Sequence, residues 1–336
     1  MTQSNQKKAL VLGVTGQDGS YLVEILLEKG YEVHGMVRRS ATGNTKHIDH
    51  LIENPEIFEK RFFLHRGDLS DTISLQRIIS EVNPDELYNE ADQDHVAWSF
   101  AIPDYSYDVT GAAVGRILEI IRTINPKIKF FQPCSSNMFG KTTESPQNEN
   151  TPFRPQSPYA CAKVLAFVLV NHYRSAYGIF ASTAIFYNHE SPRRTEEYVT
   201  RKITRTVAKI SLGLDDKLVL GDLNAKIDWG YAKEYMEMAW KILQQDTPDD
   251  FVISTGELHS VREFVEEAFS LVGLDYTKYV ATDPKFLRQA NTSVLVGDIS
   301  KARNAFGYEP KVKFKDLVKI MLDADIESLK KEHRLP

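Results

Sequence analysis

Short apolar runs and amphipathic stretches alternate along this chain. The runs have the length of strands buried on both faces, and between them apolar residues recur at the spacing of helices. This alternation, which carries no internal sequence repeat, predicts an α/β fold built on a doubly wound parallel (Rossmann) sheet, with ligands at the carboxyl ends of its strands. The predicted strands are residues 8–13, 32–37, 62–65, 86–89, 128–131, 181–187, 218–221 and 251–254, and the predicted helices are residues 20–30, 72–82, 105–123, 159–173, 200–211, 228–244 and 261–272.

The second half of the chain is expected to interleave two domains. No linker or low-complexity break separates them, so the substrate region is predicted to return to the sheet rather than to follow it. The tail, residues 299–335, is expected to combine turns with an amphipathic helix. We assign residues 1–185 to a dinucleotide-binding domain with a return segment at about 225–255, and residues 186–224 and 256–336 to a smaller α/β substrate-binding domain.

The composition is that of an ordinary soluble globular protein. Of 336 residues, 42% are hydrophobic and 26% are charged, and the net charge of -5 gives no nucleic-acid footprint. No apolar run could span a bilayer and no secretory segment is recognised, so we expect a cytoplasmic protein without membrane partners. Cys134 and Cys161 are expected to be small buried space-fillers in a reducing compartment rather than a disulfide or redox pair.

A glycine-rich turn follows the first predicted strand. Gly13, Gly16 and Gly19 precede an amphipathic helix, an arrangement that lets the backbone approach a pyrophosphate at the helix N-terminus. The spacing is GxxGxxG rather than the dinucleotide fingerprint GxGxxG, so a plain strand-to-helix turn is the alternative.

Two arginines end the second predicted strand, where NAD-binding units often place an acid. Arg38 and Arg39 suit a 2′-phosphate, so we predict NADP; a solvated basic loop is the alternative. Asp68, after the third strand, could accept a hydrogen bond from the adenine amine. The basic residues of the 200–211 helix follow an arginine-rich loop and could bind a phosphate-bearing substrate, although such charges are also typical of a solvated face.

Tyr159 and Lys163 stand four residues apart on one predicted helical face. An ammonium beside a phenol favours the phenolate, so we expect Lys163 to lower the pKa of Tyr159. Ser135, at the end of the preceding strand, can bind the same oxygen. Together the three side chains predict proton transfer for an alcohol/ketone pair, the chemistry that a hydride carrier needs.

Six motifs, in order, carry a resemblance that covers nearly the whole chain. They are GVTGQDGSYL from residue 13, GDLSD from 67, SPYACAK from 157, NHESPRR from 188, VTRKI from 199 and DWG from 228. The sequence resembles the GDP-mannose 4,6-dehydratase family of extended short-chain dehydrogenases/reductases. The resemblance implies NADP, a GDP-linked sugar substrate, no metal, and a homotetramer or dimer with cofactor loops near the subunit interface.

In that family, tyrosine takes the C4 hydroxyl proton while a hydride passes to NADP, a glutamate takes the C5 proton as water leaves C6, and the hydride returns to C6. The resemblance implies Tyr159 as the C4 base, Lys163 as its partner and Ser135 as the orienting hydroxyl. The cofactor would be bound by Gly13, Thr15, Gly16, Gln17, Asp18, Gly19, Arg38, Arg39, Asp68, Leu69, Glu90, Ala91, Asp92, Tyr105, His189 and Arg194. The sugar nucleotide would be bound by Asp94, Ser136, Asn188, Val199, Lys202, Gly221 and Arg288.

Four positions depart from the family pattern. Asn137 replaces the glutamate, Ile227 replaces an arginine, Asn291 replaces a second glutamate, and an acidic turn at 90–94 replaces a mostly apolar one. Because an amide cannot act as a base near neutral pH, three functions stay open. The chain could be a dehydratase in which Asp94 or Glu90 supplies the base. It could oxidise or epimerise C4, or reduce a 4-keto sugar, without elimination. It could also be a catalytically silent NADP/GDP-sugar-binding subunit.

Overall fold

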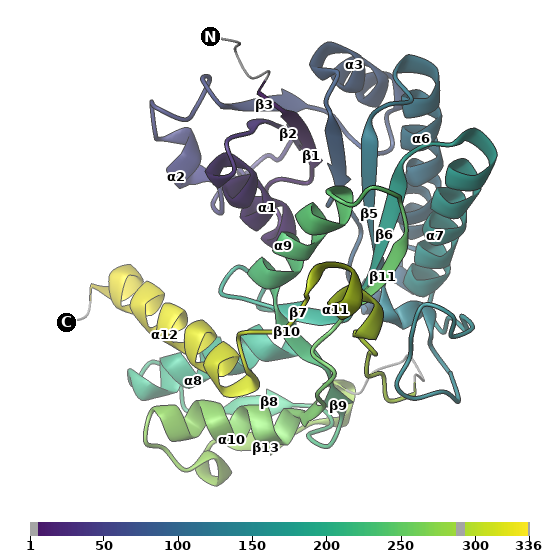
Figure 1. Ribbon diagram of the computed structural model, residues 1–336. Coiled ribbons are helices and arrows are strands. Elements are labelled where there is room, and N and C mark those ends of the chain that lie inside the picture. Colours follow the sequence, from purple (N-terminus) through teal and green to yellow (C-terminus); the bar gives the residue numbers. More distant parts are fainter. Residues whose placement is uncertain (1–5, 287–292, 335–336) are drawn as a thin grey trace.

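A seven-stranded parallel sheet forms the centre of the computed structural model, which describes residues 6–286 and 293–334 (Figure 1). The strand order is β11-β6-β5-β4-β1-β2-β3, and every neighbouring pair is parallel. This sheet confirms the predicted fold class. The strand order reverses between β1 and β4: the chain proceeds from β1 to β2 and β3 on one side and from β4 to β5 and β6 on the other. Doubly wound folds bind ligands at such a switch point. The strands are β1 Lys8–Leu12, β2 Glu32–Val37, β3 Phe62–Arg66, β4 Glu86–Asn89, β5 Lys129–Ser135, β6 Ala181–Phe186 and β11 Asp250–Ile253.

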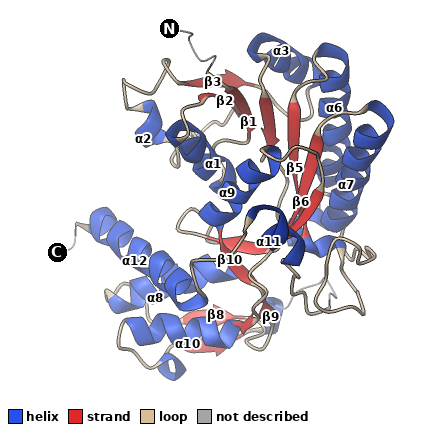
Figure 2. Cartoon of the chain, viewed as in Figure 1, coloured by secondary structure: helices blue, strands red, loops and turns tan. Residues whose placement is uncertain are grey.

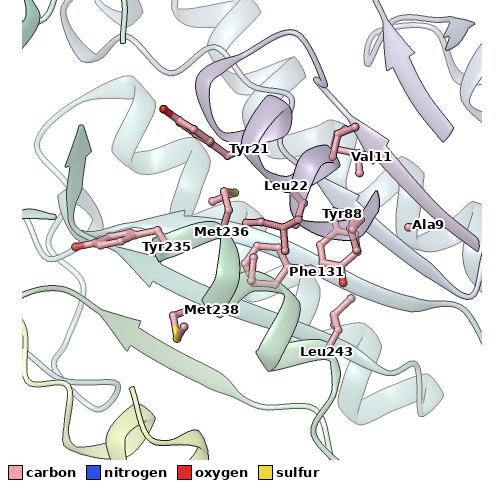
Figure 3. Packing of buried hydrophobic residues seen from close by; sticks show 14 of the residues in the cluster. Ala9, Val11, Tyr21, Leu22, Tyr88, Phe131, Tyr235, Met236, Met238 and Leu243 are labelled. Atoms are coloured by element: carbon pink, nitrogen blue, oxygen red, sulfur yellow. The ribbon is translucent and has the colours of Figure 1, made fainter. Parts of the chain in front are cut away.

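Helices cover both faces of the sheet because side chains of successive strand residues point to opposite faces. In β1, Ala9 and Val11 pack into one apolar cluster with α1 (Gln17–Glu28) and α9 (Ala232–Leu243), as Figure 3 shows. Leu10 and Leu12 pack into a second cluster on the other face. That cluster is formed with α3 (Thr72–Val82), α6 (Ala113–Ile124) and α7 (Pro158–Tyr177).

A smaller layer packs against the carboxyl-end side of the sheet (Figure 2). Its helices α8 (Val199–Ser211), α10 (Val261–Leu271) and α12 (Phe314–His333) share a third apolar cluster. Three two-stranded pairs complete the layer. They join β7 Asn188–Glu190 to β10 Trp229–Tyr231, β8 Leu218–Leu220 to β13 Val280–Thr282, and β9 Lys226–Ile227 to β12 His259–Ser260.

The remaining elements are short. They are α2 (Asp49–Ile52), α4 (Val96–Ser99), α5 (Pro103–Ser106), α11 (Ser300–Phe306), the π-helical η1 (Tyr107–Ala112), and the 3-10 turns η2 (Ser136–Met138), η3 (Tyr276–Lys278) and η4 (Pro284–Phe286). None of the helices within the described ranges combines the length and apolarity that a membrane crossing requires.

Several element predictions need correction. The helix predicted over 105–123 is three consecutive segments, α5, η1 and α6, because the chain widens into a π turn. The helix predicted from 228 begins at Ala232, since residues 229–231 form β10. The arginine-rich loop before the 200–211 helix, residues 188–194, is partly buried. It contains β7, and both Glu190 and Ser191 are buried.

The two cysteines differ in exposure. Cys134 is buried at the end of β5, as predicted, whereas Cys161 on α7 is exposed, so the prediction that both are buried is wrong. Helical periodicity explains the error, because Cys161 lies between the buried positions Ala160 and Ala162 on the outward side of α7.

Candidate active site

The glycine turn lies beside the end of β4, at the point where the strand order of the sheet reverses. Gly13 has a φ of +80°, and a Cβ there would lie 2.6 Å from the Glu90 carbonyl oxygen. At Gly19 a Cβ would lie 2.3 Å from the Gly13 oxygen, so neither position accepts a side chain without movement. Gly16 is the N-cap of α1 and no side chain caps that helix, which leaves its first N–H groups available to an anion.

An arginine-lined pocket opens at the carboxyl ends of β2 and β3. Arg38 and Arg39 follow β2, and Arg66 and Arg77 add two more guanidinium groups. Arg38 donates to the hydroxyl of Tyr105 over 2.7 Å, which connects the pocket to α5. The pocket also contains Asp68, followed by the buried Leu69, while Thr15 accepts a hydrogen bond from Asn44. Four arginines around one hollow fit a phosphate group better than a neutral ribose.

Asp18, beside the glycine turn, is paired with a buried histidine. Asp18 Oδ2 lies 2.8 Å from His189 Nε2, and His189 Nδ1 lies 2.8 Å from the Tyr187 carbonyl oxygen. Because both neighbours are acceptors, the ring is an imidazolium with two donors. Burial disfavours this charge, yet Asp18 outweighs it and raises the pKa of His189. Gln17 links the pair to Ser191, accepting from the Ser191 hydroxyl over 2.7 Å.

Glu90 is the first residue of the acidic turn. Burial, with a smaller contribution from Asp18, raises the pKa of Glu90 well above its ordinary value. Its Oε1 atom is buried and has no hydrogen-bond partner among the described residues. The environment of Glu90 therefore disfavours a negative charge at this point of the acidic turn.

Tyr159 and Lys163 face the ends of β4 and β5 from the first turns of α7. Lys163 Nζ lies 2.6 Å from Asp92 Oδ2, donates to the Pro133 carbonyl oxygen over 2.9 Å, and lies 5.7 Å from the Tyr159 ring centroid. Ser135 ends β5, and all three predicted catalytic side chains are buried. The structure thus brings Ser135, Tyr159 and Lys163 together.

The predicted lowering of the Tyr159 pKa is wrong. Burial raises the pKa of Tyr159 to about 12, and the negative charge of Asp92 adds to that effect. Lys163 and a hydrogen bond from Ser135 act in the expected direction but do not outweigh burial. Burial is the largest cause of the raised pKa, and the carboxylate of Asp92, 2.6 Å from Lys163 Nζ, opposes the effect of the ammonium.

Asn137 lies in η2, directly beyond Ser135. Its Nδ2 donates to Ser135 Oγ over 3.1 Å, and its backbone N–H donates to the same oxygen over 3.2 Å. The neighbouring Ser136 is buried. Asn137, at the position where the resemblance implies a glutamate, therefore contacts Ser135 and brings no titratable group.

A polar cluster faces the same space from the start of α8. Tyr198 donates to Asp94 Oδ2 over 2.8 Å, and the Arg194 guanidinium lies 3.4 Å from the Tyr198 ring centroid. Arg194 also lies 3.6 Å from Asp94 and 3.4 Å from Glu190. Sequence reasoning missed Tyr198; its place directly before the VTRKI motif was the available signal.

The other predicted substrate residues lie in the smaller layer. Asn188 begins β7, Val199 begins α8 with Lys202 one turn later, and Gly221 follows β8. Arg288 and Asn291 lie outside the described residues. Ile227, where the family has arginine, is buried in β9 and belongs to the apolar cluster of this layer.

Two arginines of α8 are occupied within the protein. Arg201 Nη2 lies 2.7 Å from Asp325 of α12, and the hydroxyl of Thr204 donates to the same carboxylate over 2.6 Å. Arg205 pairs with Glu332, also on α12. These contacts make both arginines structural links between two helices rather than phosphate ligands.

Comparison with known proteins adds to this geometry. The family model for GDP-mannose 4,6 dehydratase matches residues 10–321. GDP-mannose 4,6 dehydratase 1 of Arabidopsis thaliana is 49% identical over 332 residues, covering 97% of this chain and 92% of the relative. GDP-mannose 4,6 dehydratase of Homo sapiens is 47% identical, covering 96% and 92%.

Solved structures show the same architecture. UDP-glucose 4-epimerase of Thermus thermophilus, in complex with NAD, is 25% identical with a TM-score of 0.81, covering 95% of this chain and 98% of that chain. RMD from Pseudomonas aeruginosa, complexed with NADPH, has the same fold at 19% identity, with a TM-score of 0.77 and coverage of 96% and 100%. The match to the family model and the identity to full-length relatives confirm the resemblance: this chain belongs to the GDP-mannose 4,6-dehydratase family.

Proposed function

We propose that this protein is an NADP-dependent enzyme that oxidises C4 of a GDP-linked sugar and proceeds to 4,6-dehydration. The observation that carries the proposal is the convergence of Ser135, Tyr159 and Lys163 at the carboxyl ends of β4 and β5. Membership of the family named for GDP-mannose 4,6 dehydratase supports the GDP-sugar.

The residues at the carboxyl ends of β1 and β2, where the strand order reverses, fit a nicotinamide dinucleotide. The open N-terminus of α1 suits the pyrophosphate, and the pocket of four arginines suits a 2′-phosphate, which favours NADP over NAD. When bound, such a cofactor accepts a hydride from the sugar and later returns it. Gly13, Gly16 and Arg39 would hold it, together with the other residues assigned to it from the sequence.

The protein side chains handle the protons of the C4 step. Tyr159, as phenolate, would accept the C4 hydroxyl proton, and Ser135 would donate a hydrogen bond to the same sugar oxygen. Lys163 holds positive charge beside Tyr159, which favours the phenolate form that must be present before the C4 proton can be accepted. Lys202 would contact the sugar nucleotide from the smaller layer.

Elimination of water needs a second base at C5. Asn137 cannot serve, because an amide is not a base near neutral pH. Burial raises the pKa of Glu90 well above its ordinary value, which disfavours the carboxylate form that a base requires. Asp94 is the better candidate. Its side chain is 59% exposed and accepts a hydrogen bond from Tyr198 over 2.8 Å.

A second candidate function is supported by the contact between Asn137 and Ser135. Because the amide fills an acceptor position on the catalytic hydroxyl and supplies no base, the enzyme would oxidise and re-reduce C4 without losing water. It would then be either a 4-epimerase, whose product is the C4 epimer, or a reductase that acts on a 4-keto sugar.

Incubation with GDP-mannose and NADP in deuterated water tests these alternatives. Loss of water with deuterium at C5, seen by mass spectrometry and NMR, supports the dehydratase and requires a base such as Asp94. A C4-inverted sugar of unchanged mass and without C5 deuterium supports the second candidate. Binding of both ligands without any product or exchange contradicts both and indicates a silent binding subunit.

We also infer a homo-oligomer, a dimer or a tetramer, in the cytoplasm. The support is the family resemblance, the apolar exposed residues Leu165, Val168 and Tyr177 on α7, and two cysteines that are both free. Sedimentation equilibrium would test the assembly, and a monomer at micromolar concentration would contradict it.

A further inference from the structure

We propose that Asp92 is a positioning residue that sets, through Lys163, the pH range in which Tyr159 can act as a base. The inference deepens the proposed function and rests on it for the role of Tyr159. It goes beyond the family pattern, in which the corresponding turn is mostly apolar.

The contact between Asp92 and Lys163 is close, and both groups are removed from solvent. Their oxygen and nitrogen atoms lie 2.6 Å apart, and the side chains are only 14% and 5% exposed. The hydroxyl of Thr110, itself buried in η1, donates to the other carboxylate oxygen of Asp92. Asp92 is therefore fixed from one side by η1 and from the other by α7.

The contact with Asp92 weakens the effect of the Lys163 ammonium on the Tyr159 phenol. A lone ammonium near Tyr159 would stabilise the phenolate, whereas a carboxylate at hydrogen-bond distance from that ammonium cancels much of its field. Burial is the largest cause of the raised pKa of Tyr159, and the Asp92 charge raises it further while Lys163 lowers it. Burial acts to lower the pKa of Lys163, but the contact with Asp92 outweighs it and raises that pKa.

Other titratable groups also lie around Tyr159 and Lys163. On β5, burial raises the pKa of Cys134 to about 12, so that thiol is neutral. Directly after β4, burial raises the pKa of Glu90 well above its ordinary value and so disfavours its charge. In the adjoining turn Asp94 is 59% exposed and bound to Tyr198 and Arg194 in front of α8, while Asp18 on α1 is paired with His189.

The chemical consequence concerns the two directions of the C4 step. With Asp92 in place, Tyr159 is a phenol at neutral pH and is suited to donate a proton to a C4 carbonyl oxygen. Acting as base toward a C4 hydroxyl then requires a higher pH. The enzyme should therefore oxidise C4 faster as pH rises, and Asp92 should determine where that rise occurs.

Titration of Tyr159 by NMR tests the inference without any sugar. The protein is labelled with ¹³Cζ-tyrosine and saturated with NADP, and Tyr159→Phe identifies the resonance. In Asp92→Asn the titration midpoint should fall by about one pH unit or more. The matched control is Asp108→Asn, which removes a carboxylate paired with Arg116 over 2.7 Å. It should leave the midpoint of Tyr159 unchanged, because Asp108 contacts neither Tyr159 nor Lys163.

An Asp92→Asn midpoint within about 0.3 units of the wild type would overturn the inference. If Asp92→Asn does not fold, the titration midpoint of Tyr159 in the wild-type protein tests the inference instead. A wild-type midpoint below about 8 would overturn it. The pH dependence of hydride transfer from GDP-mannose provides a second readout, in which the rising limb should move with the NMR midpoint. Absence of turnover with GDP-mannose counts against the proposed function, whereas the NMR midpoints alone decide the role of Asp92.

Discussion

The hydroxyl oxygen of Ser135 accepts two hydrogen bonds from Asn137, one from the side-chain amide over 3.1 Å and one from the backbone N–H over 3.2 Å. With its oxygen occupied as an acceptor, the Ser135 hydroxyl is directed to donate its hydrogen, which suits it to bind a sugar oxygen at C4. The same contact places an uncharged group at the position from which the family removes the C5 proton. The C4 half of the reaction is thus supported by local geometry, and the elimination half is not.

Replacing Asn137 with glutamate should increase water loss from GDP-mannose. A general base typically contributes about 10²–10⁴-fold, and even a poorly placed carboxylate should give at least about tenfold. The measurement is mass loss of the sugar nucleotide with C5 deuterium in deuterated water. Asn137→Gln is the control, because it has the size of glutamate but no base.

If Asn137→Glu and Asn137→Gln lose water at the same rate, the missing glutamate is not what limits elimination. The acidic turn at 90–94 or Ile227 would then be what limits the elimination of water.

Tyr159→Phe should abolish C4 chemistry in every enzymatic interpretation of this site. Losing the phenol hydroxyl removes the proton acceptor, which should lower the rate at least about 10²–10⁴-fold, while the aromatic ring still fills its buried position. Single-turnover formation of NADPH measures the effect, with NADP affinity by calorimetry as the check on folding. Tyr173→Phe is the matched control, since Tyr173 lies on the same helix and donates to Glu119 over 3.1 Å. Retained turnover in Tyr159→Phe would refute the site assignment.

Local patterns predicted the elements that depend on local periodicity. The predicted bounds of residues 32–37 and 72–82 coincide with β2 and α3, because each is a clean apolar or amphipathic run between polar turns. The parallel sheet followed from their alternation. Ser135, Tyr159 and Lys163 could be found because two of them share one helix turn and the third ends a recognisable strand.

The features that escaped prediction depend on tertiary contacts. Asp92 and Lys163 are 71 positions apart (163 − 92), and nothing in either local sequence indicates that their charges meet. The same holds for Tyr198 and Asp94. β7 is three residues long and polar, and it forms only because β10 offers it a parallel partner. Its hydrophobic pattern therefore carried no strand signal.

NADP should bind more tightly than NAD, and Arg39 should account for part of the difference. Arg39→Ser removes one of four guanidinium groups around the pocket, and a charged hydrogen bond to phosphate supports an affinity loss of about tenfold to a hundredfold. The affinity for NAD should not change. Calorimetric titration with both dinucleotides measures this. Arg303→Ser is the control, because Arg303 is exposed and paired with Glu309 elsewhere. Equal affinities of the wild type for the two cofactors would refute the prediction.

The pair of Asp18 and His189 should make the stability of the protein depend on pH. The folded-state pKa of His189 is raised, so its contribution is complete below its ordinary pKa of about 6.5 and is lost as pH rises through the folded value. Burial acts to raise the pKa of Asp18, but His189 outweighs it and lowers that pKa. The contribution of Asp18 is therefore present above about pH 4 and is lost as pH falls through its folded value.

Asp18→Asn should accordingly lower the free energy of unfolding by about 1–3 kcal/mol at pH 5.5 and by clearly less at pH 9. Urea denaturation at the two pH values measures the difference. Asp108→Asn is the control, because its partner Arg116 keeps its charge throughout and any destabilisation should be equal at both pH values. The two contacts of His189 require an imidazolium, since Asp18 and the Tyr187 carbonyl both accept. An effect of Asp18→Asn that is the same at pH 5.5 and pH 9 would mean that His189 is neutral in the folded protein, and that Asp18 faces the pyrophosphate site as an uncompensated charge.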